Sequence, residues 1–421
     1  MRKSVKVRVL IYDILREIHQ KNKNFDETFI NLTQNLKLDD RDRSMVYNIV
    51  LNSIRNNFFI DKILNNFLQK KTDLKIRILL LSAITQILYL DFKDYAVTND
   101  TVEIAKIKKL NPGLINSLLK NIIKNKESIN KKKFSESSVP SWFSKALKKN
   151  RLSLKEVIEN ITNEPSLHLV FKNKNLLKLF KTEHEKTTEL SAFVLNDKKI
   201  KDLENYEKGH WWVQDFSSML PIHLSPEIKS KKVLDMCAAP GGKSFQTICL
   251  NNNVTLNDIS LKRVKKLKDN LNRLNLNNEI KNYNALEMPE KEKFDIIVLD
   301  SPCSGVGTLR RNPDILFKKK PPNFDFLTKV QENLINKAAK LLNINGVLIY
   351  MVCSFLYDET KGIKSKFLNK NKNFSQYHFK LGSDNNFKDY LDIDGDIFCI
   401  PSKFKNYMVD GFYSVKFIRN D

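Results

Sequence analysis

The chain lacks the sequence features of zinc-binding, disulfide-stapled and membrane-spanning proteins. Its 421 residues include only five cysteines, none in a CxxC pair or a Cys/His spacing typical of zinc ligands. The longest apolar run, Ile78–Leu90, is too short to cross a bilayer and contains Ser82, Thr85 and Gln86, so it predicts a buried helix. Charged residues interrupt the N-terminus, and no export signal is evident. We therefore expect a cytoplasmic protein with reduced thiols, no bound metal and no membrane contact.

Acidic residues are also in short supply. The sequence carries 72 Lys and Arg residues against 48 Asp and Glu residues, which gives a formal net charge of +24. An excess of this size favours a polyanionic partner, and nucleic acid is the first candidate. A genome biased towards lysine and asparagine is the alternative, because lysine is spread along the whole chain. Charge alone leaves both explanations open.

Helical periodicity dominates the first part of the chain. Apolar residues recur on one helical face from residue 6 to about residue 123, and the last of these helices follows Pro112-Gly113. Residues 124–133 are polar without periodicity and predict a linker, and a weak mixed pattern follows. We therefore predict a multi-domain protein. It has an all-α domain over residues 1–127, a small α+β domain over residues 138–220 and a third domain over residues 221–421.

Strands and helices alternate in the third domain. The final residues, Gly411–Ile418, alternate like an antiparallel edge strand. Together the pattern predicts a Rossmann-like α/β fold with a mixed seven-stranded sheet, which binds its ligands at the carboxyl ends of the strands. The other expected strands are Val233–Asp235, Val254–Asp258, a polar one near Ile280, Phe294–Asp300 and Gly346–Cys353, and helices are expected over Lys262–Leu274 and around Asn323–Leu342.

The segment Val233–Ser244 is the centre of the third domain. It has the pattern of a strand, a tight turn and a helix N-terminus, which brings backbone N–H groups close to a ligand. Gly241 and Gly242 leave room for that approach and tolerate positive φ. A phosphate loop needs its first glycine at the position of Cys237, so nucleotide hydrolysis is disfavoured. The turn better suits a ligand that carries a carboxylate and an ammonium group.

Two polar residues end the next predicted strands. Asp258 is placed to accept hydrogen bonds from a pair of ribose hydroxyls, although Asp258 or Ser260 also suits the cap of the following helix. Asn284 is placed to meet an adenine amino group, but it also suits a turn. The sequence favours ribose binding for Asp258 and leaves Asn284 open.

Two of the five cysteines follow neighbouring predicted strands. Asp300-Ser301-Pro302-Cys303 ends one strand and Val352-Cys353-Ser354 ends the next. One cysteine alone is most simply a core residue, but two at adjacent strand ends favour a reactive site. A thiolate beside a methyl donor suits methylation of a pyrimidine at C5, because addition at C6 turns C5 into a nucleophile. A carboxyl group near N3 stabilises the developing charge, and a second thiol or a water removes the C5 proton.

These motifs resemble those of the RNA 5-methylcytosine methyltransferases of the Sun/Nop2 superfamily. Val233–Ser244, Asp300–Gly305 and Cys353-Ser354 are similar to its donor-binding, Asp-x-Pro-Cys and Thr-Cys-Ser motifs, and Gln214-Asp215 and Asp410–Tyr413 also fit. Within it, the bacterial small-subunit rRNA enzymes of the Sun (RsmB) type are the most similar group. The helical first domain resembles the antitermination factor NusB, on the basis of Asp40-Arg41, Ile54-Arg55 and Thr101–Ala105.

The resemblance implies an S-adenosylmethionine-dependent enzyme that forms 5-methylcytosine in 16S rRNA, at cytosine 967 in the resembled family. It puts Cys353 in the nucleophile position and Cys303 in the position that assists proton removal and product release. Asp300 takes the position that stabilises the pyrimidine. The implied donor-binding residues are Cys237, Ala238, Ala239, Pro240, Gly241, Gly242, Lys243, Asp258, Arg263, Asn284 and Asp300.

Three positions depart from the family pattern. Val352 replaces the usual Thr before the nucleophile, and Ser301 replaces a usual Ala. Asn284 stands where Asp is usual, so it accepts a hydrogen bond without carrying charge, and we expect a lower donor affinity.

Four further patterns have competing interpretations. Trp211-Trp212 suits either base stacking or core packing. Arg310–Asp314 with Lys318–Lys320 suits contact with RNA phosphates, or a solvated loop. The lysines of the helix over Lys262–Leu274 suit a solvated face. Asp392, Asp394 and Asp396 imitate a calcium loop, but Gly395 falls in the wrong place, so we reject a calcium site.

Other functions remain open at this point. A tRNA or another rRNA is an alternative substrate, and DNA cytosine methylation, in which the Pro-Cys thiol attacks, is an alternative reaction. A non-catalytic, NusB-like rRNA-binding assembly factor is the alternative class. The sequence does not decide between naked RNA and an assembling subunit as substrate, nor does it fix the oligomeric state, for which a monomer is expected.

Overall fold

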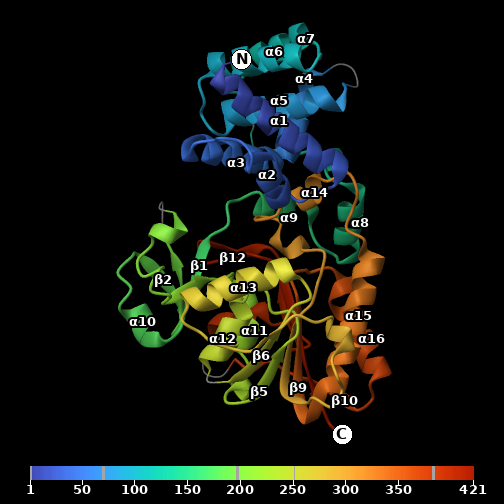
Figure 1. The fold of residues 1–421 in the computed structure, drawn as a ribbon. Coiled ribbons are helices and arrows are strands. Elements are labelled where there is room, and N and C mark those ends of the chain that lie inside the picture. The colour runs from blue at the N-terminus through green and yellow to red at the C-terminus, as the bar shows by residue number, and fades with distance from the viewer. Residues whose placement is uncertain are drawn as a thin grey trace. The chain divides into compact units, whose positions relative to one another are not determined.

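The computed structural model describes residues 2–68, 72–129, 131, 133–195, 199–250, 252–381 and 385–421. The chain forms two compact units (Figure 1). The helical unit contains Met1–Asn163 and Leu309–Pro322, and the sheet unit contains Glu164–Thr308 and Asn323–Asp421. The helices at residues 141–161 fold with the helical unit, and the small sheet that follows them folds with the sheet unit. The three-domain division at residues 127, 138 and 220 stays a prediction.

The helices between residues 3 and 124 bury their apolar faces in one core. As predicted, the long apolar run forms a buried helix, because every residue from Ile78 to Leu88 is buried. The last of these helices begins at Pro112, where Asn111 Oδ1 accepts the N–H of Leu114 at 3.0 Å. Among the described residues, no helical segment combines the length and hydropathy that a membrane span requires. The helices are α1 (Lys3–Lys21), α2 (Phe25–Thr33), α3 (Asp40–Arg55), α4 (Asn57–Phe67), α5 (Leu74–Leu88), α6 (Asp94–Ile107), α7 (Pro112–Lys124), α8 (Ser141–Lys149), α9 (Leu154–Ile161) and α14 (Asp314–Phe317).

The segment Leu309–Pro322 is built into the helical unit, and this corrects one prediction. Its helix α14 packs on α1 and α3. Arg310 is only 1% exposed, and its Nε donates to the carbonyl of Asn160 at 2.8 Å. The Arg310 side chain is therefore a structural anchor and is not available to RNA phosphates. Lys318 and Lys319 line a groove of about 790 Å³ in the same unit, and for them contact with RNA stays a prediction.

A four-stranded antiparallel sheet opens the sheet unit, in the order β2-β3-β1-β4. Trp211 and Trp212 of its last strand are buried, and their indole N–H groups donate at 2.8 Å to the carbonyl of Glu204 and to Gln214 Oε1. Core packing is therefore the correct interpretation for both, and base stacking is excluded. The elements are β1 (Leu167–Phe171), α10 (Lys174–Lys178), β2 (His184–Thr188), β3 (Ser191–Val194) and β4 (Trp211–Val213).

The main sheet is mixed, as predicted, with the order β10-β14-β9-β8-β5-β6-β7 and with β11 also paired to β14. Strands β7, β6, β5, β8 and β9 are parallel, whereas β14 runs antiparallel to its neighbours. The main strands are β5 (Lys232–Asp235), β6 (Asn253–Asn257), β7 (Ile280–Lys281), β8 (Phe294–Asp300), β9 (Leu342–Val352), β10 (Phe374–Tyr377), β11 (Ile397–Cys399) and β14 (Phe412–Arg419), and β12 (Ser402–Phe404) and β13 (Tyr407–Val409) form a separate hairpin.

The predicted edge strand is an interior strand. β14 lies between β9 on one side and β10 and β11 on the other. Ser414 and Lys416 gave β14 its alternating pattern, but both are buried. Ser414 Oγ donates to the carbonyl of Tyr350 at 2.9 Å, and Lys416 Nζ pairs with Glu227 at 2.6 Å. The polar residues are thus satisfied inside the protein, which alternation alone does not distinguish from exposure to water.

Successive residues of the central strands pack into two cores on opposite faces of the sheet. Val233, Ile296 and Val298 belong to one core, together with side chains of α11, α12 and α13. Leu234 and Ile297 belong to the other, together with side chains of α15 and α16. Both faces are covered, so the strands are apolar throughout. The helices are α11 (Phe216–His223), α12 (Gly242–Cys249), α13 (Leu261–Arg273), α15 (Phe324–Leu341) and α16 (Lys361–Lys370).

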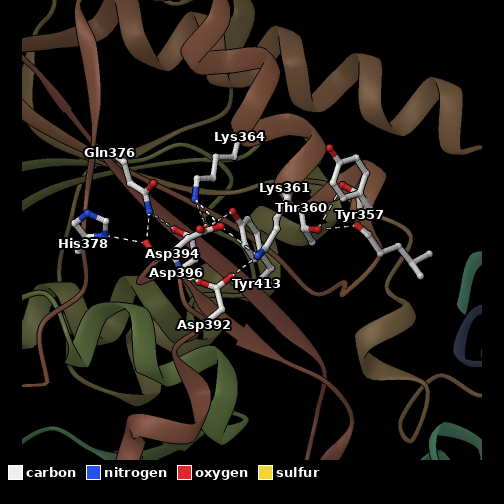
Figure 2. Close-up of polar contacts among 11 residues, drawn as sticks. Tyr357, Thr360, Lys361, Lys364, Gln376, His378, Asp392, Asp394, Asp396 and Tyr413 are labelled. Atoms are coloured by element: carbon white, nitrogen blue, oxygen red, sulfur yellow. Dashed lines mark hydrogen bonds and ion pairs between the residues drawn. The ribbon is translucent and has the colours of Figure 1, made fainter. Parts of the chain in front are cut away.

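An ionic network fastens α16 to the C-terminal strands (Figure 2). Lys364 Nζ lies 2.8 Å from Asp396 Oδ2, and the Tyr413 hydroxyl donates to the same oxygen at 2.8 Å. Lys361 Nζ lies 2.8 Å from Asp392 and 3.2 Å from Asp394. The three aspartates that imitate a calcium loop are therefore paired with ammonium groups of α16. Burial raises the pKa of Asp396, and Lys364 and Tyr413 oppose that shift.

Removing one lysine of this network tests its contribution to stability. Lys364→Met leaves the buried Asp396 carboxylate without its cation, so we expect the free energy of unfolding of the sheet unit to fall by about 3 kcal/mol. Lys366→Met on the same helix is the control, because Lys366 pairs with Glu332 in a largely exposed position and we expect it to cost less than about 1 kcal/mol. Urea denaturation measures both. Equal losses in the two variants would contradict this interpretation.

Candidate active site

The register of β8 and β9 brings the two predicted cysteines to one place. The strands are parallel, and Asp300, the last residue of β8, lies opposite Met351. Backbone hydrogen bonds hold the following loops together: Ser301 N donates to Met351 O, and Gly307 N donates to Cys353 O, each at 3.0 Å. The two loops therefore leave the sheet side by side, as the sequence predicted for adjacent strand ends.

The two thiols are close enough to affect one another. Hydrogen bonding to Cys353, together with burial and the charge on Cys353, raises the pKa of Cys303 well above its ordinary value. Both side chains are partly exposed. Cys303 is thus a thiol that keeps its proton.

Lys243 joins this pair through its side chain. Its Nζ lies 2.7 Å from Asp300 Oδ2 and 5.1 Å from the ring centroid of Phe412. Burial lowers the pKa of Lys243, but the charges on Asp300 and Cys353 outweigh it, so the pKa lies above its ordinary value. Lys243 is predicted from the sequence to bind the donor. The structure directs its ammonium group to Asp300, close enough to Cys353 for their charges to interact.

The turn after β5 has the conformation expected of a ligand-binding turn. Gly241 has φ +119°, and a Cβ there would lie 2.0 Å from the Phe245 ring. Helix α12 begins at Gly242, so its first N–H groups are presented at the turn. Ala238 N donates to Asn257 O at 2.8 Å, which fixes the start of the turn against β6. Pro240 O accepts from Asn270 Nδ2 at 3.0 Å.

Asp235 and Cys237 lie beneath this turn. Ser244 Oγ donates to Asp235 Oδ2 at 2.7 Å, and the carboxyl group is fully enclosed. Burial raises the pKa of Asp235 to about 7. Burial, followed by the charges on Asp235 and Asp300, raises the pKa of Cys237. Cys237, which was predicted to bind the methyl donor, therefore stays a neutral thiol and is not a nucleophile.

Asp258 makes the contacts of a helix-capping residue. Its Oδ1 accepts from Ser260 N at 2.9 Å and its Oδ2 accepts from Ala239 N at 3.3 Å, while Ser260 Oγ caps α13. Arg263 covers the carboxylate, with Nη2 2.8 Å from Oδ2. Both predicted capping residues thus take part. Ribose binding stays a prediction, and it requires the half-exposed Arg263 to move aside.

Asn284 is a turn residue, and exposed apolar side chains surround it. Its Oδ1 accepts from Leu286 N at 3.2 Å, and its Nδ2 donates to Glu287 at 2.9 Å. Contact with adenine stays a prediction. Ile259 is 64% exposed and Tyr283 is 58% exposed, next to Asp258 and Asn284 at the carboxyl ends of β6 and β7. Neither residue was predicted from the sequence. The one sequence feature that points to them is that each is an apolar residue directly beside a predicted polar contact.

Comparisons with known proteins identify both parts of the chain. Residues 221–418 match the family model described as 16S rRNA methyltransferase RsmB/F, and residues 5–124 match the NusB family. Residues 221–418 therefore belong to the RsmB/F family of RNA methyltransferases. The chain is 27% identical to the probable ribosomal RNA small subunit methyltransferase B of Bacillus subtilis, over 88% of this chain and 90% of that protein. It is 25% identical to the enzyme of that name in Proteus mirabilis, over 87% of this chain and 92% of that protein.

Solved structures share the fold. The crystal structure of PH0851 superposes with a TM-score of 0.69 and 18% identity, over 99% of both chains. A methyltransferase homolog protein from Pyrococcus horikoshii gives a TM-score of 0.50 and 19% identity, over 67% of this chain and all of that one. At these identities the likeness concerns the fold alone.

The methyl donor of this family is S-adenosylmethionine, and the residues of the turn fit it. The N–H groups at the start of α12 suit the donor's carboxylate, and the exposed Ile259 and Tyr283 suit a flat, apolar adenine ring. When bound, the donor supplies an electrophilic methyl group on a sulfonium. The methyltransferase therefore combines a turn that suits the donor with a pair of thiols at neighbouring strand ends.

The conformation of Gly241 yields a prediction about donor binding. Gly241→Ala puts a Cβ into the Phe245 ring at a φ that other residues avoid, so the turn must shift. We expect the Kd for S-adenosylmethionine, measured by titration calorimetry, to rise at least roughly 10-fold, which is about 1.4 kcal/mol. The comparison is Gly242→Ala, whose Cβ meets Gln214 at an ordinary 3.4 Å. A larger effect at Gly242 than at Gly241 would contradict the proposed strain.

The raised pKa of Asp235 predicts a pH dependence of stability. A carboxyl group whose pKa is higher in the folded state binds its proton more tightly there, so its contribution to stability is full below about pH 4 and is lost as the pH rises to about 7. An asparagine side chain does not titrate in this pH range, so Asp235→Asn removes the loss of stability that occurs as the pH rises. We therefore expect the variant to gain stability relative to the wild type between pH 5 and pH 7, by about 1 kcal/mol per pH unit. Asp269→Asn, at an exposed position of α13, is the control and should follow the wild-type slope.

Proposed function

We propose that the protein forms 5-methylcytosine in 16S rRNA through a covalent intermediate, with Cys353 as the nucleophile. The convergence of Cys303 and Cys353 at adjacent strand ends, beside the Lys243–Asp300 ion pair, is the observation that supports this reaction most. Cytosine 967 is the target nucleotide in the resembled family and is part of the proposal. A cytoplasmic location, a monomeric state and independence from metal stay predictions.

The first step is addition of Cys353 to C6 of the target cytosine. A thiolate is the attacking form, and the Lys243 ammonium is near enough to Cys353 for their charges to interact. The new S–C6 bond pushes electrons to C5 and towards N3, where Asp300 and Lys243 are proposed to stabilise the developing charge. A bound donor would then supply its methyl group to C5, with the S–CH3 bond of the sulfonium breaking and the donor leaving as a neutral thioether. The base must be unpaired or flipped out of the RNA to reach these groups.

Release requires removal of the C5 proton, and Cys303 suits that task once Cys353 is occupied. The pKa of Cys303 is raised above all by its hydrogen bond to Cys353. A Cys353 sulfur that is bonded to C6 carries no negative charge, so this cause disappears and Cys303 loses its proton to water more readily. The Cys303 thiolate then takes the C5 proton. The C5–H electrons form the C5=C6 double bond, and the S–C6 electrons return to Cys353 as a thiolate.

Trapping with a fluorinated substrate tests the assignment of the two thiols. Cytosine that carries fluorine at C5 has no proton to lose, so RNA containing 5-fluorocytosine should form a stable adduct with the wild-type protein and its donor. Cys353→Ala should abolish the adduct. Cys303→Ala is the matched control: it should still form the adduct, and should also accumulate it with ordinary cytosine, because release is blocked.

The outcomes separate the competing functions. An adduct that survives in Cys353→Ala and is lost in Cys303→Ala would reverse the two assignments. A DNA acceptor that is methylated in place of RNA would point to the alternative reaction. A wild-type protein that binds RNA without methyl transfer or adduct would be a binding factor, and the proposal would fall.

A further inference from the structure

One buried carboxylate holds the loop that carries Cys303 on both sides of the cysteine. Glu359 is fully buried. Its Oε1 accepts from Ser304 N at 2.8 Å, and its Oε2 accepts from Ser304 Oγ at 2.5 Å. Gln331 Nε2 donates both to Glu359 Oε1 at 3.1 Å and to the carbonyl of Pro302 at 2.9 Å. The residues before and after Cys303 are thus tied to the same side chain, directly or through one amide.

Glu359 is also fixed relative to Cys353. It ends the 3₁₀ turn Tyr357–Glu359, six residues after Cys353 in the chain. Its carbonyl accepts from the Tyr350 hydroxyl at 2.9 Å, and Tyr350 lies in β9, the strand that leads to Cys353. Glu359 therefore connects the two cysteine loops, with its backbone on one and its carboxylate on the other.

Burial of the Glu359 carboxylate costs free energy because the group loses its contacts with water. Among the described residues, no lysine, arginine or histidine lies within ion-pair distance of Glu359, so hydrogen bonds alone compensate for the loss of water. Two acceptor oxygens on one side chain receive the N–H and the O–H of Ser304 together. An amide of the same shape offers only one acceptor and turns a donor towards the other. With both groups of Ser304 donating, the contacts as they stand use both oxygens of a carboxylate.

We propose that Glu359 is a positioning residue that holds the Cys303 thiol against Cys353 and thereby sets the rate of product release. The inference rests on the proposed function, because Cys303 acts there only after methyl transfer. The hydrogen bonds of the Glu359 carboxylate go to Ser304 and Gln331, which lie outside the turn at Gly241. Loss of Glu359 should therefore spare donor binding and adduct formation and should slow only the step that needs Cys303 in place. The negative charge of Glu359 also raises the pKa of Cys303. In this proposal the Cys303 thiol therefore keeps its proton until Cys353 reacts.

The experiment compares turnover with the amount of covalent complex on ordinary, unfluorinated RNA. Glu359→Gln should lower kcat by about 10- to 100-fold, because a displaced catalytic group costs rates of this order. The KM for RNA and the Kd for S-adenosylmethionine should stay within about twofold of the wild type. Covalent complex should accumulate, as in Cys303→Ala. Glu359→Asp keeps both oxygens and should restore part of the rate.

Two further variants keep the test decisive. Ser304→Ala removes one of the hydrogen bonds and leaves the carboxylate in place, so it should show the same pattern in weaker form even if Glu359→Gln folds poorly. Glu332→Gln is the matched control, since Glu332 neighbours Gln331 on α15 but pairs with the exposed Lys366 at 2.6 Å. It should behave as wild type.

Two results would overturn the inference. One is a Glu359→Gln variant with wild-type turnover. The other is an equal loss of turnover and of covalent complex while Ser304→Ala is unaffected, which is the pattern of a purely structural residue. Failure of the proposed function is recognised separately, because the wild-type protein would then form no adduct with 5-fluorocytosine RNA.

Discussion

Parallel pairing of β8 with β9 over residues 296–300 is the interaction on which the site depends. With Asp300 opposite Met351, the loops after the two strands begin at the same level, and Cys303 and Cys353 come within hydrogen-bonding contact. A shift by one residue would turn every side chain of a strand to the other face of the sheet. Burial of both faces prevents such a shift, because alternate residues of these strands fill two separate cores. The hydrophobic cores thus determine the geometry of a polar site.

Charge at the site is distributed so that the two sulfur atoms differ. Lys243 and Asp300 form an ion pair beside Cys353, whereas the carboxylate of Glu359 lies on the Cys303 loop. The two sulfur atoms thus have differently charged neighbours, which in the proposed reaction suits Cys353 to attack and Cys303 to carry the proton. In that proposal Lys243, the second residue of α12, connects the turn expected to bind the methyl donor with the nucleophile.

Much of this was accessible from the sequence, and the failures have physical causes. Strand and helix patterns gave the mixed sheet and the helical first part, and the two cysteines were found because both follow apolar strands. The edge assignment of β14 failed because Ser414 and Lys416 are polar but satisfied internally. The prediction that Arg310 contacts RNA phosphates was wrong because the sequence does not distinguish a buried arginine that donates to a carbonyl from an exposed one. Glu359 was missed because its partners lie far away in sequence, at Ser304 and Gln331.

The central claim is that Cys303 keeps its proton beside Cys353, and differential alkylation measures this most directly. The intact protein is treated with iodoacetamide over a range of pH, and the modified peptides are quantified by mass spectrometry, with denatured protein as the reference for intrinsic reactivity. The account predicts that Cys353 is alkylated at lower pH than Cys303, and that Cys303 reacts only when the pH is raised well above the ordinary value for a thiol. Alkylation of Cys303 first, or of both at the same pH, would contradict it.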